Sequence, residues 1–314
     1  MMRTERLAHL ALWLGLALLV AAPFIGLYPI FMMKALCYAI FAMAFNLLMG
    51  FTGLLSFGHA AYFGAAAYAT GWLVRSTGLT PELGVIAGTA VAAVLGLGIG
   101  LIAIRRQGIY FAMVTLAMAQ MVYFVFLQAP FTGGEDGLQG VPRGNLFGFI
   151  SLQSDLVLYF VVLTVFVAVF LFVIRVVHSP YGQVLKAIRE NEPRAISLGY
   201  DVDRYKLLAF VLSTALAGLA GSMKTLVLGF VTLNDAHWSL SGEVILMTLL
   251  GGLTTFAGPV LGAFTIIGLQ NFLADQVGSW INVIIGVIFV VCVVAFRRGF
   301  VGELKAWQLK RSKT

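Results

Sequence analysis

The chain has 314 residues, of which 61% are hydrophobic and 11% are charged, with a formal net charge of +7 and a mean hydropathy of +0.98. Soluble domains are about half apolar and carry about 25% charged residues, so this composition excludes a soluble globular protein and predicts an integral membrane protein. The basic residues are dispersed between apolar stretches and form no patch interleaved with aromatics, which argues against nucleic-acid binding.

Continuous apolar stretches predict that the chain crosses the membrane as helices. Residues 83–104 and 155–177 are apolar throughout, and about 20 such residues span a hydrocarbon layer of about 30 Å. An outer-membrane barrel would instead alternate apolar and polar side chains in segments of roughly 10 residues. We therefore predict an all-α, polytopic helical membrane bundle. The spans, about ten in number, are predicted at 7–28, 31–50, 54–74, 83–104, 108–128, 155–177, 207–230, 243–256, 259–274 and 279–296.

The distribution of Lys and Arg residues gives the predicted orientation, once the nature of the first span is decided. It could be a cleaved signal peptide, but Pro23 interrupts any small-residue cleavage site, which favours an uncleaved helix. With the amino terminus in the cytoplasm, all but four of the 20 Lys and Arg residues face inward, as the positive-inside rule requires. Both termini are therefore predicted in the cytoplasm, with a basic tail at 297–314. The outward exceptions are Lys34, Arg75, Arg143 and Lys224.

A glycine-rich break at Gly50 and Gly53 leads into candidate pathway residues. Unwound backbone inside a membrane is tolerated where protein or an aqueous cavity satisfies it, so the break indicates a translocation pathway. Alternatively, the glycines allow close helix packing and the histidine bonds to a neighbouring helix. The pathway candidates are Ser56, Phe57, Gly58, His59 and, on a later span, Gln120.

The segment 129–153 is predicted as an outer, periplasmic loop. It contains enough glycine and acidic turn residues for a compact structure. The composition alone fits a simple surface turn; that the loop faces a binding protein is what the family resemblance given below implies. The residues expected to face that partner are Gly133, Gly134, Glu135 and Asp136.

The segment 178–206 is too polar for lipid and predicts two short cytoplasmic helices. Val184, Leu185 and Ile188 share one face of the first helix, as in an amphipathic element. In the second, Asn191 can form the N-cap, Pro193 can occupy the first turn, and a later glycine can end it. Such a pair suits docking on another protein. A membrane-surface element that covers the bundle is the alternative.

The last third of the chain contains a charge and a break. Lys224 lies in the outer part of its predicted helix, where we expect it to snorkel toward water. Gly251, Gly252, Gly258 and Pro259 interrupt the apolar run at 243–274. This run therefore predicts either two short crossings or a broken or re-entrant pair.

The sequence lacks the motifs of several enzyme classes. No G-x-x-x-x-G-K-[ST] is present, so we expect no ATP site in this chain. The sequence contains no H-E-x-x-H motif, no G-x-S-x-G motif and no paired carboxylates within the spans. It therefore does not favour an intramembrane enzyme. Cys37 and Cys292 both fall in apolar segments and suit neither a disulfide framework nor a zinc site. We expect no catalytic residue, metal or cofactor in this chain.

Four ordered stretches resemble a known transporter family: 46–68, 132–142, 179–221 and 250–263. They are similar to the permeases of branched-chain amino acid ABC importers, specifically the M-type subunit. The related H-type subunit has a pattern closer to I-N-F-A-H-G, where this chain has LSFGHA at 55–60. Thr254, where the family often has glycine, and Pro193, in a loop that more commonly lacks proline, are departures that concern the local backbone.

The resemblance implies a multi-pass permease of the bacterial inner membrane. It implies a heterodimer with an H-type permease, two cytoplasmic ATPases that carry ATP and magnesium, and a periplasmic solute-binding protein. The solute would be a branched-chain amino acid, although relatives of this family move urea, short amides or aromatic acids. An ATPase-independent secondary transporter remains a remote alternative, because ionisable residues near the membrane midplane are scarce.

The resemblance also assigns the loop 178–206 to ATPase coupling. The family pattern of E-A-A followed by glycine corresponds here to Glu192, Ala195 and Gly199, with Arg194 at the second alanine. The residues expected to couple to the ATPase are Ala187, Ile188, Arg189, Glu190, Glu192, Arg194, Ala195 and Gly199.

Overall fold

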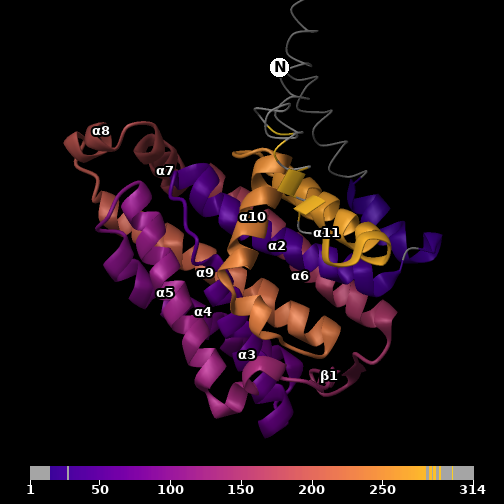
Figure 1. Cartoon of the computed structure of the whole chain (residues 1–314). Helices are drawn as coiled ribbons and strands as arrows, with labels where there is room; N and C mark the ends of the chain where they lie inside the picture. The colour runs from indigo at the N-terminus through magenta and orange to yellow at the C-terminus, as the bar shows by residue number, and fades with distance from the viewer. Residues whose placement is uncertain are drawn as a thin grey trace, which may run out of the picture.

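The computed structural model describes residues 15–26 and 28–280, and isolated positions at 283, 284, 286, 287, 290 and 299. The described chain is nearly all helical (Figure 1). Its elements are η1 Ala22–Ile25, α2 Pro29–Thr52, α3 His59–Thr77, α4 Pro81–Ala103, α5 Ile109–Gln128, η2 Pro130–Thr132, η3 Gly134–Asp136, β1 Asn145–Leu146, β2 Ile150–Ser151, α6 Asp155–His178, α7 Pro180–Glu190, α8 Glu192–Ser197, α9 Val202–Leu228, η4 Leu233–Ala236, α10 Trp238–Gly251, α11 Gly258–Val277 and η5 Gly278–Trp280.

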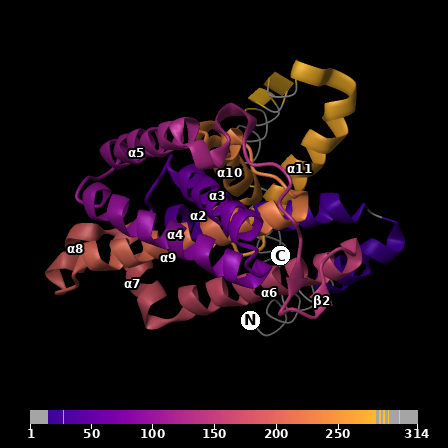
Figure 2. The ribbon, with the colours of Figure 1, turned by 90° about the horizontal axis from the view of Figure 1, so that it is seen from below.

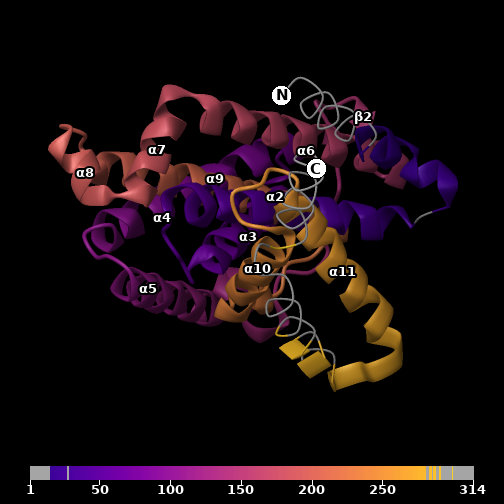
Figure 3. The same ribbon diagram turned by 90° about the horizontal axis from the view of Figure 1, so that it is seen from above.

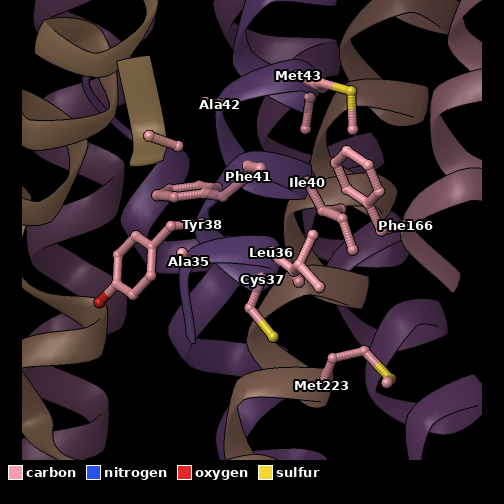
Figure 4. Packing of buried hydrophobic residues seen from close by; sticks show 14 of the residues in the cluster. Ala35, Leu36, Cys37, Tyr38, Ile40, Phe41, Ala42, Met43, Phe166 and Met223 are labelled. Carbon is pink, nitrogen blue, oxygen red and sulfur yellow. The ribbon is translucent and has the colours of Figure 1, made fainter. Parts of the chain in front are cut away.

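Helix α2 is the centre of the bundle. It packs between α6 on one side and α10 and α11 on the other (Figure 3), and it also contacts α9. Leu36, Ile40 and Phe41 are completely buried, and Figure 4 shows the apolar side chains that surround them. A helix that is apolar on all faces belongs in the interior of a membrane bundle, where other helices replace lipid around it.

The predicted spans agree with the described helices in type, with some shifted ends. Within the described residues, five helices are long and apolar enough to cross a membrane: α2, α4, α5, α6 and α9. Shorter apolar helices cover Gly15–Ile25, Trp238–Gly251 and Gly258–Leu273. The predicted span 54–74 begins later than expected, because residues 53–58 are not helical and α3 starts at His59. Most of the last predicted span, the basic tail apart from Gly299, and both termini lie outside the described residues.

Small residues bring α3, α4 and α9 close together. A methyl group added at Gly221 of α9 would overlap the backbone carbonyl of Phe63 on α3. One added at Gly96 of α4 would overlap the Thr214 side chain of α9. Close backbone approach at small residues is a general mode of helix association in membranes, where burial of apolar surface gives little driving force. Helix α3, rich in alanine and glycine, is therefore enclosed by protein.

The two ends of the bundle carry the polar segments. Helices α7 and α8 lie at one end, and the β1–β2 turn lies at the opposite end (Figure 2). The turn is an antiparallel pair of two-residue strands, a small exception in a described chain that is otherwise helical, as predicted. The backbone reverses there at Phe147 and Gly148, which both have positive φ.

Candidate functional site

The α7–α8 unit is built by side-chain caps at three successive helix starts. The Ser179 hydroxyl accepts from the Gly182 amide at 3.3 Å, and the Asn191 side chain accepts from the Arg194 amide at 3.1 Å. Asp201 caps α9 in the same way. Pro193 occupies the first turn of α8, where the helix needs no donor from it. The predicted cap, proline position and helix pair are therefore confirmed.

Glycine ends α8, as predicted. Gly199 has a φ of 87°, a conformation that is strained for residues with a Cβ. The Tyr200 amide donates to the Ala195 carbonyl at 3.3 Å, the six-to-one bond of a Schellman-type helix end. The chain can then turn sharply into α9.

The apolar face of α7 packs on this chain's own helices. Leu185 is fully buried, and Ile188 and Ala195 are 3% and 2% exposed. Ile188 and Ala195 form a small cluster with Val202 of α9. The prediction that this face docks on another protein was wrong, because an amphipathic helix beside a bundle can bury its apolar stripe within the same chain.

An ion pair fixes α8 to the start of α9. The Lys206 Nζ atom lies 2.6 Å from Glu192 Oε1, and the side chains are 4% and 22% exposed. Gln107, in the connection between α4 and α5, donates to the same carboxylate oxygen at 3.0 Å. Glu192, predicted to contact an ATPase, thus connects three segments of its own chain: α8, the start of α9 and the connection between α4 and α5.

Tyr181 adds a second contact between α7 and α9. Its ring stacks on Tyr205 with centroids 5.6 Å apart, and its hydroxyl donates to the Tyr205 carbonyl at 3.0 Å. Burial, and then the neighbouring Tyr205, raise the pKa of the Tyr181 hydroxyl. It therefore remains a neutral donor at physiological pH.

Arg189 joins α7 to the end of α2. Its guanidinium donates to the Gly50 carbonyl, and its side-chain carbons lie against the position that a Cβ at Gly53 would occupy. Gly53 has a φ of 78° and ends α2. The glycine break predicted near this place is therefore in direct contact with the α7–α8 unit.

The outer side of the unit combines charged and apolar groups. Ala187, Glu190, Arg194 and Gly199, all predicted coupling residues, are exposed. Next to them lie three large exposed side chains that the sequence prediction missed: Ile196 at 56%, Leu198 at 68% and Tyr200 at 39%. The spacing of these three residues in the sequence did not predict an exposed apolar surface, because α8 is too short to show a helical period. We call Ile196, Leu198 and Tyr200 the α8 patch.

A cavity of about 520 Å³ opens beside the unit. The ring of His178 stacks on Phe256 with centroids 5.3 Å apart, and Phe256 stacks on Phe51 at 5.8 Å. The cavity is thus lined both by aromatic rings and by charged groups of α7. Its lining residues are Phe51, Val177, His178, Lys186, Arg189, Glu190, Thr254 and Phe256.

The break at 53–58 is held by hydrogen bonds between helices. His59 Nε2 lies 2.8 Å from the Ser213 hydroxyl of α9, and His59 is fully buried. The Phe57 amide donates to Thr115 of α5 at 3.2 Å, and the buried Ser56 hydroxyl accepts from the Gly58 amide at 3.2 Å. His59 was predicted either to line a pathway or to bond to a neighbouring helix, and this geometry supports the bond between helices.

Gln120, the remaining pathway candidate, does not join this group. It is half-buried on α5, more than one turn beyond Thr115 along the helix. A pathway role for Ser56, Phe57, Gly58, His59 and Gln120 stays a prediction.

Asn46 holds the second break, between α10 and α11. Its side-chain nitrogen donates to the Thr255 carbonyl at 3.0 Å, and its oxygen accepts from the Thr254 amide at 3.3 Å. Thr254 has a φ of 65°, which is strained for a β-branched residue. This strain explains why glycine would suit position 254 better than threonine. The interrupted run at 243–274 forms two helices, which residues 252–257 join.

The outer loop is tied to the segment that follows α9. Leu138 and Val231 exchange two backbone hydrogen bonds of 2.9 Å, and the Val141 amide donates to Gly229 at 2.8 Å. Glu135 and Asp136 remain exposed on η3. The predicted compact loop is present, with its acidic side chains directed to the surroundings.

Lys224 is an internal ion-pair partner. It is 4% exposed, and its Nζ atom lies 2.7 and 2.6 Å from the two carboxylate oxygens of Asp235. Asp235 also accepts from the Thr232 amide at 2.9 Å. The prediction that Lys224 snorkels was wrong, because a carboxylate eleven residues later in the chain folds back on it.

The described residues contain no cluster of His, Cys, Asp or Glu that could hold a metal ion. Cys37 is buried as a free thiol among apolar side chains.

Comparisons with known proteins give a consistent result. A family model described as "Branched-chain amino acid transport system / permease component" matches residues 28–293. The chain is 29% identical to the high-affinity branched-chain amino acid transport system permease protein LivM of Escherichia coli (strain K12) over 261 residues, which cover 76% of this chain and 61% of that protein. A probable LivM of Methanocaldococcus jannaschii is 25% identical over 72% of this chain and 75% of its own length.

A second type of permease matches over a shorter region. The probable branched-chain amino acid transport permease protein LivH of Methanocaldococcus jannaschii is 28% identical over 161 residues, which cover 48% of this chain and 47% of that protein. No solved structure matches the chain.

Proposed function

Because the chain belongs to the family of branched-chain amino acid transport system permease components, we propose that it forms half of the translocation pathway of an ABC importer. The proposed solutes are leucine, isoleucine and valine. The longer similarity to LivM than to LivH supports the M-type assignment. The chain is a multi-pass integral membrane protein, and we place it in the inner membrane of a bacterium.

The proposed partners follow from the same assignment. A second, H-type permease completes the pathway, two ATPases supply ATP hydrolysis with magnesium, and a periplasmic protein delivers the solute. This chain acts as a transport subunit and not as an enzyme. Solute choice rests mainly with the delivering protein, so urea, short amides and aromatic acids remain alternative solutes.

The observation that carries the proposal is the attachment of the α7–α8 unit. Lys206 connects it to α9 through Glu192, and Arg189 connects it to the end of α2. These two helices also frame the buried His59–Ser213 contact, since the Ser213 hydroxyl of α9 donates to the Ala44 carbonyl of α2 at 2.5 Å. A displacement of the unit therefore moves α2, which ends at the break at 53–58, and α9, which bonds to His59 directly after it.

The α8 patch is the proposed contact with the ATPase. It presents large apolar side chains beside exposed Glu190 and Arg194, and an apolar centre with a charged rim is the usual anatomy of an interface. Burial of such side chains by a partner is worth about 1.5–3 kcal/mol each. The residues that remain available to an ATPase are thus different from the buried Ile188 and Ala195.

The test is association of the complex in detergent. We expect Ile196→Asp with Leu198→Asp to lose ATPase co-purification while the permease still inserts and folds. Arg204→Glu is the control, because it also adds negative charge at this end of the bundle and Arg204 is exposed. Normal co-purification of the double variant would contradict the α8 patch as the ATPase contact.

A further inference from the structure

The cavity beside the α7–α8 unit lies where membrane-spanning helices end. Its lining includes Phe51 in the last turn of α2, Val177 and His178 at the end of α6, and Phe256 in the connection between α10 and α11. The remaining wall is formed by α7, the polar helix that follows α6 at a sharp corner (Figure 2). A ligand in this cavity therefore lies at the boundary between bilayer and water, with aromatic rings on one part of it and charged groups on another.

Two cations of α7 line the cavity and have hydrogen-bond donors to spare. Lys186 is half-buried and takes part in none of the four ion pairs of the described residues. Arg189 donates to the Gly50 carbonyl through Nη1, but a guanidinium has five N–H donors, so others remain for a ligand. The two residues are three positions apart and share a face of the helix. This arrangement indicates an anionic group in the ligand.

A carboxylate lines the same cavity. Glu190 follows Lys186 by four residues, a spacing at which a helix can form an ion pair, yet neither residue belongs to any ion pair of the described chain. The carboxylate is therefore free to accept a hydrogen bond from a cationic group of a ligand. The ring of Phe256 adds an electron-rich face, which also attracts an ammonium group. The lining thus suits a ligand that carries both charges.

An exposed face of α6 connects the cavity with the bilayer. Leu171, Arg175 and His178 succeed one another by about one turn and share this face. All three are exposed, Leu171 to 59%, and His178 also lines the cavity. A ligand with a long apolar chain can therefore bind with its head in the cavity and its chain along α6. A free amino acid is too short to use this face.

We propose that the cavity binds an aminophospholipid, a lipid whose head group carries a phosphate and a primary ammonium group. Lys186 and Arg189 bind the phosphate, Glu190 accepts from the ammonium group, and Phe256 contacts the beginning of an acyl chain. Charge-assisted hydrogen bonds are the strong ones, and basic pockets between membrane helices hold lipid head groups in other proteins. The lipid joins α7 to the connection between α10 and α11. This site requires membrane insertion and does not depend on the proposed solute or ATPase.

The experiment measures lipid binding to the full chain in detergent by native mass spectrometry, with phosphatidylethanolamine as the probe. We expect Lys186→Gln to raise the Kd about tenfold, the effect of losing one charge-assisted hydrogen bond, and Lys186→Arg to retain binding. Glu190→Gln should weaken phosphatidylethanolamine but not phosphatidylglycerol, which has the phosphate without the ammonium group. Arg106→Gln, at an exposed position in the connection between α4 and α5, is the control and should leave the Kd unchanged.

Two further ligands test the parts of the lipid separately. Phosphatidylcholine should bind the wild-type chain more weakly than phosphatidylethanolamine, because its methylated ammonium group cannot donate a hydrogen bond. Free phosphoethanolamine, the head group without acyl chains, should not displace the lipid at equal concentration.

Three results would overturn the site. They are an unchanged Kd for phosphatidylethanolamine in Lys186→Gln and Glu190→Gln, equal binding of phosphatidylcholine and phosphatidylethanolamine, and displacement of the lipid by an equal concentration of phosphoethanolamine or leucine. Melting temperatures check that the variants are folded, and the comparison of lipids on the wild-type chain does not depend on any variant. Absence of ATP-driven uptake would contradict the proposed function and leave the lipid result unaffected.

Discussion

Lys206 at the start of α9 and Glu192 at the start of α8 form an ion pair of 2.6 Å in which the lysine side chain is 4% exposed. The pair joins the surface unit that we assign to ATPase coupling to the longest helix of the described chain. Such a bond is useful to a transporter because it lets two elements move as one body.

Removal of this lysine should loosen the unit without unfolding the bundle. We expect Lys206→Met to reduce the free energy of unfolding by about 2 kcal/mol, because Glu192 then loses its charged partner. ATP-driven uptake should fall more than ATP hydrolysis. The double variant Lys206→Glu with Glu192→Lys should recover part of both. Equal stability of Lys206→Met and the control Arg106→Met, at an exposed position, would show that the ion pair is unimportant.

The Lys224–Asp235 pair should matter more, since both side chains are about 95% buried. Lys224→Met leaves a buried carboxylate without its partner, which costs about 3–5 kcal/mol. The double variant Lys224→Met with Asp235→Asn should be less damaged than the single one. Thermal unfolding in detergent measures both.

A partly exposed pair provides the comparison. Arg143 and Asp155 have side chains 20% and 44% exposed, so Arg143→Gln should cost only about 1 kcal/mol. If Arg143→Gln lost more stability than Lys224→Met, burial would not be the reason that one ion pair contributes more than the other.

Thr254 should be improved by glycine. Its φ of 65° is unfavourable for a β-branched side chain, so Thr254→Gly should stabilise the protein by about 1 kcal/mol. The matched control is Thr265→Gly in the middle of α11, where glycine should destabilise by about 1 kcal/mol. A melting temperature lowered by both substitutions would indicate that Thr254 is unstrained.

The glycine contacts between α3, α4 and α9 predict a contrast between two alanine substitutions. Gly221→Ala would place a methyl group against the Phe63 carbonyl and should cost about 1–3 kcal/mol through overpacking. Gly98→Ala on α4 has open space around its Cβ position and should be neutral or stabilising by up to about 1 kcal/mol. Similar melting temperatures for the two variants would be inconsistent with close packing at Gly221.

The sequence predicted the helices and their caps well where local chemistry decides them. Asn191, Pro193 and Gly199 bound α8 as expected, because capping depends on residues a few positions apart. The resemblance to the branched-chain amino acid permeases is confirmed by the family match.

Contacts between residues far apart in the chain could not be predicted from the sequence. Nothing local indicates that Asp235 returns to neutralise Lys224, or that the apolar face of α7 is buried by α9 rather than by a partner. The α8 patch likewise could not be predicted, because it is recognised only when the neighbouring buried residues are known.

The most direct measurement of the central claim is leucine uptake into proteoliposomes. The vesicles would contain this chain with an H-type permease and the ATPases, with loaded binding protein outside the vesicle and ATP inside. We predict uptake that requires internal ATP and stops when the ATPases are omitted. Uptake by this chain alone, driven by an ion gradient without any ATPase, would contradict its assignment to an ABC importer.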